Sequence, residues 1–183
     1  MSSQPKAPPV TATDHVSGPE AAPVTLIEYG DFQCPYCGAA YPILKRVQAR
    51  LGSRLRFVFR NFPLVQVHPN AQHAAVAAES VAARGGAEAF WAMHDQLFEH
   101  QSALGDSNLA GYAAAAGVDG EKVLEDVVKG RYEEAVHDSF VGGVHAGVNG
   151  TPTLYIDGIR YDGPRDEETL VAALHPSPPS GHL

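Results

Sequence analysis

Cysteine is scarce in this chain, since only Cys34 and Cys37 occur among its 183 residues. Two cysteines are too few for the disulfide framework that holds a small secreted domain together. The pair is separated by only two residues, in the sequence "CPYC". A Cys-x-x-Cys spacing is more typical of redox chemistry or of metal binding than of a structural disulfide.

Basic residues and long apolar runs are also few. Lys and Arg number 13 against 21 Asp and Glu, which gives a formal net charge of −8. This excess of acid disfavours binding to nucleic acid or anionic lipid, because both need a cationic surface. No apolar run approaches the ~20 residues that a membrane-spanning helix needs. The hydrophobic fraction of 44% is nevertheless sufficient for the core of one globular domain.

The N-terminal segment has none of the apolar core that a secretory signal requires. It is instead rich in Pro, Ser, Thr and Ala, which predicts a flexible tail over residues 1–20. If Met1 is the true start, we expect a cytoplasmic protein. A chain from which a signal had been removed would instead be periplasmic.

A strand–helix–strand unit follows this segment. The short apolar run at residues 24–30 is typical of a buried strand, and residues 54–62 alternate as a second strand. Apolar residues at helical spacing predict a helix over 35–51, with a kink at Pro42 that separates a first short segment from the remainder. This order implies a parallel pair of strands joined by a crossover helix.

An alanine-rich block with helical patterning comes next, and Gly85 and Gly86 end its first helix. After Gly150, two short apolar runs flank Asp157-Gly158, a dipeptide that favours a two-residue hairpin turn. The whole order predicts an α/β fold with a mixed sheet and an inserted helical domain. Besides the helix over 35–51, helices are expected at residues 71–84, 87–101, 107–117 and 166–174, and residues 119–130 and 131–147 are expected to supply one or two more. The expected domain boundaries are 21–66 and 148–175 for the two parts of the sheet core, 67–147 for the helical insertion and 176–183 for a C-terminal tail.

The position of Cys34 at the start of a helix favours redox chemistry. Unpaired backbone N–H groups and the helix dipole stabilise an anion there, so the thiol pKa falls from about 8.5 towards roughly 3.5–7.5. The thiolate is the attacking species in disulfide exchange, and Cys37, one turn further along, is placed to resolve the mixed disulfide. Pro35 suits the first helical position, where its missing N–H is not needed.

Two other interpretations of the cysteine pair are weaker. The cysteines could be small buried residues, but they lie at a strand-to-helix junction rather than on a core face. They could also form half of a zinc site with His68 and His73. The chain between Cys37 and His68 is far longer than the usual ~12–15 residues, so the histidines are interpreted as a loop residue and a helix-surface residue.

Two further residues stand out. Glu28 lies in an apolar strand, six residues before Cys34. If it is buried, its pKa is raised and it can relay the proton of Cys37; the alternative is that it points outward at a strand end. Pro152 directly precedes a strand, but only about 5–6% of X–Pro bonds are cis, so the Thr151-Pro152 bond by itself indicates an ordinary turn.

Taken together, these motifs resemble the DsbA-like branch of the thioredoxin superfamily over about residues 18–174. A Cys-x-x-Cys alone is only moderately specific, but the ordered combination with an acid six residues upstream is highly specific. The segments that carry the resemblance are "DFQCPYC", "FVFRNFPL", "HPNAQHAA", "AFWAMHDQLF" and "GVNGTPTLYIDG".

The resemblance implies a role for each site residue. Cys34 matches the nucleophile, Cys37 the resolving cysteine and Glu28 the buried acid that assists proton transfer. Pro152 matches a cis-proline that faces the active site, and Thr151 the residue whose backbone pairs with the substrate chain.

The two residues between the cysteines, Pro35 and Tyr36, are expected to contact the substrate as well. The strongly oxidising periplasmic DsbA has Pro-His at this place, so Pro-Tyr implies a less oxidising pair.

The implied activity is thiol-disulfide exchange with protein substrates, and no cofactor is expected beyond a redox-active Cys34–Cys37 disulfide. A thioredoxin-type reductant or glutathione is the expected redox partner. Two alternatives remain open at this point. One is a glutathione-linked reductase or isomerase of the same fold, and the other is a chaperone-like module that binds unfolded clients.

Overall fold

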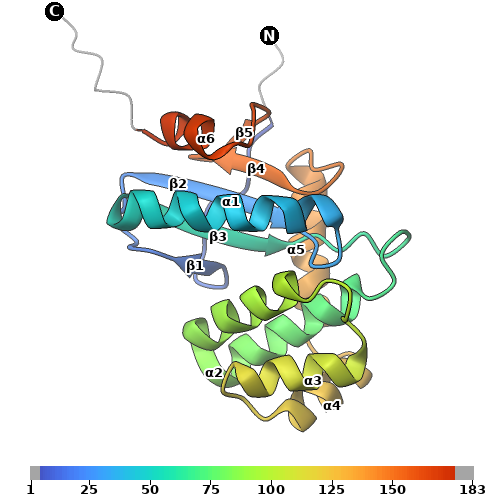
Figure 1. Ribbon diagram of the computed structural model, residues 1–183. Helices are drawn as coiled ribbons and strands as arrows, with labels where there is room; N and C mark the ends of the chain where they lie inside the picture. The colour runs from blue at the N-terminus through green and yellow to red at the C-terminus, as the bar shows by residue number, and fades with distance from the viewer. Residues whose placement is uncertain (1–4, 176–183) are drawn as a thin grey trace, which may run out of the picture.

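The computed structural model describes residues 5–175, so the C-terminal tail expected at 176–183 lies outside the described part. Within these residues lie five strands and six α-helices, with one short 3-10 turn after the first helix (Figure 1). From Val24 onwards the elements follow the order that the sequence predicts, whereas the strand His15–Ser17 was not predicted. No helix within residues 5–175 is long and apolar enough to cross a bilayer. The elements are β1 (His15–Ser17), β2 (Val24–Gly30), α1 (Pro35–Leu51), η1 (Gly52–Arg54), β3 (Leu55–Asn61), α2 (Ala71–Glu99), α3 (Asp106–Ala115), α4 (Gly120–Val128), α5 (Glu133–His145), β4 (Thr153–Ile156), β5 (Ile159–Tyr161) and α6 (Glu167–Ala173).

The strands form one mixed sheet in the order β1-β3-β2-β4-β5. β2 and β3 are parallel, with Val24 opposite Leu55 and Gly30 opposite Asn61, which confirms the predicted crossover unit. The other neighbouring strands are antiparallel. β2 is therefore the central strand, and all seven of its residues are buried.

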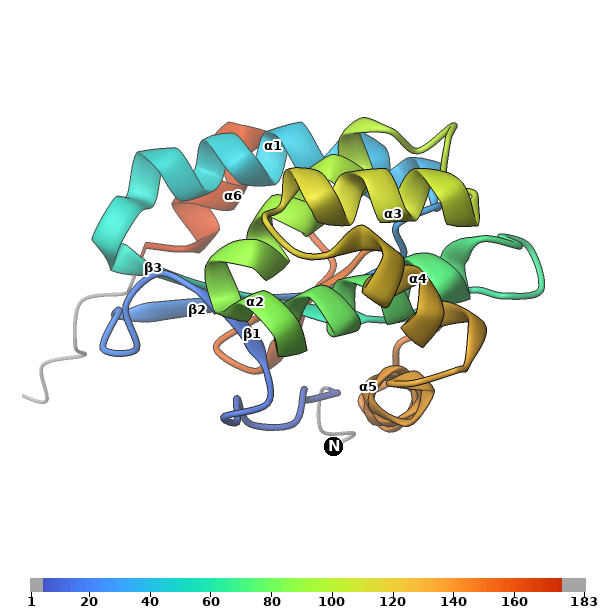
Figure 2. The same cartoon turned by 90° about the horizontal axis from the view of Figure 1, so that it is seen from below.

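Helices cover both faces of this sheet. Leu26 and Phe57 face the larger core cluster, to which α1, α2 and α6 contribute. Ile27 and Tyr155 face the second cluster, which α5 and the loop that follows it cover. Figure 2 shows α1 and α6 on one side of the strands and α5, seen end-on, on the other. Burial on both faces explains why β2 is a continuous apolar run rather than an alternating one.

The helical block enters the chain between β3 and β4, as predicted. Its first long helix, α2, is broken at Gly86, whose φ of 78° and ψ of −167° are not helical. The expected pair of helices on either side of Gly85 and Gly86 is thus confirmed. The hairpin is confirmed as well, since Asp157 (φ 48°) and Gly158 (φ 82°) both adopt the positive φ of a two-residue turn.

The expected division of the first helix at Pro42 is wrong, because α1 runs unbroken from Pro35 to Leu51. A proline removes one hydrogen bond of the helical ladder and leaves the others in place. Pro42 is exposed, whereas Cys37 and Leu44 on either side of it are buried in the same core cluster. Burial of one continuous apolar face keeps the two halves of the helix together.

The predicted flexible tail is also wrong for residues 5–20, because residues within this range pair with the sheet. Residues 15–17 form β1, which pairs antiparallel with β3 along the edge of the sheet. Lys6 forms a β-bridge with Ile159 at the opposite edge. Composition described this segment as polar and Pro-rich, but it did not show that the sheet offers it two edges to pair with.

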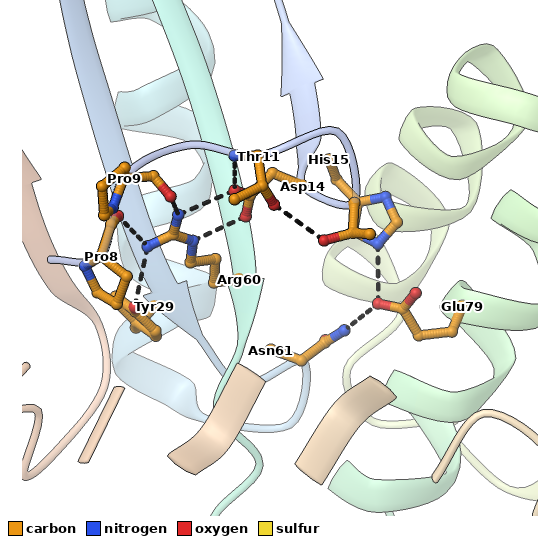
Figure 3. Close-up of polar contacts among 10 residues, drawn as sticks. Pro8, Pro9, Thr11, Asp14, His15, Tyr29, Arg60, Asn61 and Glu79 are labelled. Atoms are coloured by element: carbon orange, nitrogen blue, oxygen red, sulfur yellow. Dashed lines mark hydrogen bonds and ion pairs between the residues drawn. The ribbon is translucent and has the colours of Figure 1, made fainter. Parts of the chain in front are cut away.

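The side chain of Arg60 holds this segment in place, as Figure 3 shows. It is only 8% exposed, and all five of its N–H donors are used. Two of them bind the carboxylate of Asp14 at 2.7 and 2.9 Å. The others bind the carbonyls of Pro8 and Pro9 and the hydroxyl of Tyr29, at 3.0 to 3.1 Å.

Arg60→Lys is expected to lower the free energy of unfolding by about 2 kcal/mol, because an ammonium has three donors and lacks the planar fork. Denaturant unfolding followed by circular dichroism measures the change. Arg54→Lys is the matched control, since Arg54 is exposed and its replacement should change stability by less than about 0.5 kcal/mol. Equal stability of the two variants would show that the Arg60 fork does not fix the N-terminal segment.

Candidate active site

The junction between β2 and α1 places Cys34. β2 ends at Gly30, and Cys34 is the N-cap of α1, with the extended φ of −68° and ψ of 123° typical of that position. Its N–H donates to the carbonyl of Asp31 at 3.1 Å, which closes a tight turn. Pro35 occupies the first helical position, as the sequence predicts. The sulfur of Cys34 therefore lies at the positive end of α1.

The pKa of the Cys34 thiol is lowered from 9.0 to about 5. The largest cause is a hydrogen bond from the Cys37 thiol, which lowers the Cys34 pKa, whereas burial raises it. The Thr151 hydroxyl and the backbone N–H groups of Cys37 and Tyr36 lower it further. The Thr151 Oγ1 is buried and has no hydrogen-bond partner within residues 5–175, so its hydroxyl is available to donate to the sulfur. Cys34 is consequently a thiolate at neutral pH.

Cys37 has the opposite character. It is fully buried, and desolvation, followed by the hydrogen bond that it donates to Cys34, raises its pKa well above 9.0. The backbone N–H of Asp31 lies 3.5 Å from its sulfur. Both cysteines are in the reduced form in this structure. The two thiols thus share one proton, which Cys37 holds while Cys34 carries the charge.

Glu28 is buried beneath this pair and does not point outward. Its residue is 2% exposed, and its Oε1 has no hydrogen-bond partner within the described chain. Desolvation raises its pKa from 4.5 to about 8; Arg165 lowers it and the charge of Cys34 raises it further. The negative charge of Glu28 in turn raises the pKa of Cys37. Glu28 is therefore a neutral acid at pH 7, and its ionisation is coupled electrostatically to both sulfurs.

Thr151 and Pro152 reach the site through the sheet. β4 pairs antiparallel with β2, so the loop before β4 lies at the end of β2 that leads to Cys34. The Thr151 carbonyl is 3.5 Å from the Cys34 sulfur, and the Thr151-Pro152 bond is cis. Pro35 and Tyr36 are exposed beside them, Tyr36 at 75%. The structure thus brings together all seven residues that the sequence predicted for the site.

Asp31, His68 and Gln101 are polar residues around the site that the sequence did not mark as site residues. Asp31 is buried and accepts hydrogen bonds from the backbone of Gln33 and Leu64 and from His68, at 2.7 to 2.9 Å. Gln101 donates to the backbone beside Cys34. Only the position of Asp31 directly after a strand was a usable signal, because the partners of Gln101 and His68 are distant in the sequence.

His68 and His73 lie in the loop before α2 and in α2, as interpreted from the sequence. His68 pairs with Asp31, and His73 pairs with Asp106, each at 2.7 Å. Within residues 5–175, no group of three or more His, Cys, Asp or Glu side chains is placed to hold a metal ion. The two histidines and the two cysteines therefore do not form one cluster.

A reactive cysteine at a helix start, a buried partner cysteine and a facing cis-proline on a mixed sheet define a thioredoxin-like class of protein. The family model described as thioredoxin matches residues 10–175, so the chain belongs to the thioredoxin family.

Solved structures of similar fold include the thiol-disulfide exchange protein alpha-DsbA2 from Wolbachia pipientis, which superposes with a TM-score of 0.74 at 22% identity, covering 89% of this chain and 86% of that one. Oxidised BdbD from Bacillus subtilis superposes with a TM-score of 0.84 at 22% identity, covering 94% of this chain and 97% of that one. MdbA from Corynebacterium diphtheriae, described as a thiol-disulfide oxidoreductase, superposes with a TM-score of 0.72 at 20% identity and 95% coverage of both chains. These comparisons show that the fold is DsbA-like.

Relatives of higher sequence identity are much longer proteins. A protein of Salinispora arenicola named Na(+)/H(+) antiporter NhaA 1 is 42% identical over 161 residues. The match covers 88% of this chain but 24% of that protein. A protein of the same name from Mycolicibacterium vanbaalenii matches at 42% identity over 26% of its length. The chain thus spans about a quarter of these relatives, and the rest of each relative lies outside the similarity.

Proposed function

We propose that this protein is a thiol-disulfide oxidoreductase that acts on protein disulfides, with Cys34 as the nucleophile and Cys37 as the resolving cysteine. The observation that carries the proposal is the opposite shift of the two thiol pKa values within one helical turn. The Cys34 thiolate attacks first, and the protonated Cys37 reacts in the second step. The two cysteines carry the electrons themselves, so the reaction needs no further cofactor.

In the reducing direction, the Cys34 thiolate attacks one sulfur of a client disulfide. A Cys34–client disulfide forms, and the other client sulfur leaves as a thiolate that takes up a proton. Cys37 then loses its proton and attacks Cys34, which releases the second client sulfur as a thiolate and leaves the Cys34–Cys37 disulfide. The oxidising direction is the same sequence reversed, and the same atoms balance.

Glu28 is the proposed partner of Cys37 in proton transfer. When the Cys34–Cys37 disulfide is attacked at Cys34, Cys37 leaves as a thiolate in a buried site, where a charge is costly. Glu28 is protonated at pH 7 and donates to it, since its pKa of about 8 lies between that of water-exposed carboxyls and that of buried Cys37. In the opposite direction, the ionised form of Glu28 accepts the proton.

The client is proposed to bind across the exposed rim of the site. Cys34 is 3% exposed, and the exposed residues beside it, Pro35 and Tyr36, together with the Thr151 loop form the proposed path for a client disulfide. Tyr36 offers a large apolar face to a client. The backbone of Thr151 is the proposed site of pairing with an extended client chain. A thioredoxin-type protein or glutathione would then exchange electrons with the disulfide.

Cys37→Ser tests this proposal, because the variant keeps the nucleophile and lacks the resolving thiol. We expect it to accumulate a mixed disulfide with a model protein disulfide such as insulin, visible on a non-reducing gel and by mass spectrometry. Cys34→Ser/Cys37→Ser is the control and should form no adduct. An adduct with oxidised glutathione but none with the protein disulfide would contradict protein exchange and favour the glutathione-linked alternative.

A further inference from the structure

We infer that Gln101, which the helical block contributes, is a positioning residue for Cys34. Its side-chain amide binds the backbone turn that carries Cys34, and so links the helical block to the redox pair. The inference rests on the proposed role of Cys34, but its geometry is independent of any client.

The Gln101 amide bridges two carbonyls on either side of Gln33. Its Nε2 donates to the carbonyl of Phe32 and to that of Cys34, each at 2.9 Å. An amide nitrogen has two hydrogens and both are used here, so the two acceptors define the orientation of the amide. The Cys34 carbonyl also accepts from the N–H of Gly38 at 3.0 Å. Gln101 therefore ties the turn before the helix to the first turn of α1.

Gly38 leaves the space that this contact requires. A Cβ atom at Gly38 would lie 2.0 Å from Oε1 and 2.7 Å from Cδ of Gln101, which is closer than real Cβ contacts come. Glycine inside a helix is less stable than alanine by roughly 0.5–1 kcal/mol. The chain thus places a helix-weakening residue next to the nucleophile, at the point where the glutamine approaches.

The end of α2 leads directly to Gln101. Gln101 follows Glu99, the last residue of α2, by two positions. Phe98 in the last turn is 6% exposed and packs on Phe32, with ring centroids 5.0 Å apart. A buried aromatic contact therefore anchors the helix end to the residue before the redox turn. Phe98 in the last turn of α2 and Gln101 just after it therefore both contact the short segment that leads to Cys34.

The Gln101 contact affects the pKa of Cys34 through the backbone N–H donors in the first turn of α1. The N–H groups of Tyr36 and Cys37 are among the groups that hold the Cys34 pKa low, and their direction depends on a well-formed first turn. Loss of the bridge leaves the Cys34 carbonyl with the N–H of Gly38 as its remaining partner and removes the tie to the Phe32 carbonyl, which loosens that turn. The thiolate then loses part of its stabilisation, and the dithiol form becomes less favoured relative to the disulfide.

Gln101→Met tests the inference, because methionine has a similar length and no amide donors. We expect the midpoint of thiolate formation at Cys34, followed by ultraviolet absorbance, to rise by about one pH unit. The equilibrium with glutathione should shift roughly three- to tenfold towards the disulfide form. Gln66→Met is the matched control, since Gln66 is exposed in the loop before α2 and should change neither quantity.

A second set of variants addresses the contact itself. Gly38→Ala is expected to destabilise the protein and to raise the Cys34 midpoint when Gln101 is present. In a Gln101→Ala background the same change should be neutral or stabilising, because the clash is gone and alanine favours the helix. An equal effect of Gly38→Ala in both backgrounds, or an unchanged Cys34 midpoint in folded Gln101→Met, would overturn the inference.

These readouts separate the inference from the proposed function. The Cys34 titration and the unfolding of the Gly38 and Gln101 variants need no client protein. Failure of Cys37→Ser to capture a protein disulfide would contradict the proposed function. A raised Cys34 midpoint in Gln101→Met would still support the positioning role of Gln101. A shifted capture rate with an unchanged midpoint would remove the positioning role alone.

Discussion

Replacement of Cys34 by serine is expected to reduce thiol-disulfide exchange by about 10³-fold or more, to the rate of the buffer reaction. Cys34 is the only thiolate of the site at neutral pH, because its pKa is about 5 while that of Cys37 lies well above 9.0. Loss of Cys34 also removes the hydrogen bond between the two sulfurs. The remaining thiol is buried, protonated and unable to substitute for it.

Turnover of an insulin disulfide with a thiol reductant measures this effect. Cys37→Ser supplies the comparison, since it should still attack the disulfide once and then stall as the mixed species. Unfolding curves of both variants show whether serine has changed the fold rather than the chemistry. Undiminished turnover by the Cys34→Ser variant would rule out the assigned nucleophile.

The second large effect is expected from Glu28→Gln, and it appears in the pH dependence of stability. Glu28 has a pKa of about 8 in the folded protein against an ordinary value of 4.5. Between these values the folded chain holds a proton that the unfolded chain releases, so stability falls as the pH rises from about 4.5 through 8. At roughly 1.4 kcal/mol for each pH unit, the loss is on the order of 4 kcal/mol.

Cys34 contributes in the opposite sense, so the comparison must separate the two groups. Its folded pKa of about 5 lies below its ordinary 9.0, so its contribution increases over the same pH range and is lost as the pH falls through 5. This term is present in both the unchanged protein and Glu28→Gln. The difference between their pH dependences therefore reports Glu28.

Denaturant unfolding of the reduced proteins at about pH 5 and pH 9 measures both dependences. Glu28→Gln should gain stability relative to the unchanged protein between the two pH values, by several kcal/mol on the order given above. Glu88→Gln is the control, because Glu88 is exposed on α2 and its removal should leave the pH dependence as it was. Parallel curves for the unchanged protein and Glu28→Gln would mean that Glu28 ionises normally.

Local sequence patterns predicted most of the elements correctly, because the signals that define them are short-range. The apolar run ending at Gly30, the Cys34 N-cap with Pro35 after it, and the Asp157-Gly158 turn all act within a few residues. The order of these elements then limited the topology to a mixed sheet with a helical insertion.

Errors arose where a distant contact overrides a local preference. Pro42 weakens a helix locally, yet burial of Leu44 and Cys37 in one core keeps α1 whole. The Pro-rich segment before β1 has little tendency to order by itself, yet Arg60 from the adjacent strand binds it with five donors. Neither partner is recognisable from spacing, because a contact between sequence-distant residues leaves no local pattern.

The sequence by itself determined that two cysteines lie one turn apart at a helix start, which is sufficient to expect a reactive thiolate. Only the tertiary structure decided the environment of that thiolate. Pairing of β4 with β2 brings Thr151 to the sulfur of Cys34 across 117 residues of chain. Burial on the core face of β2 keeps Glu28 neutral, and the end of α2 brings Gln101 to the turn. Each of these effects depends on packing and desolvation, which arise only when distant segments meet.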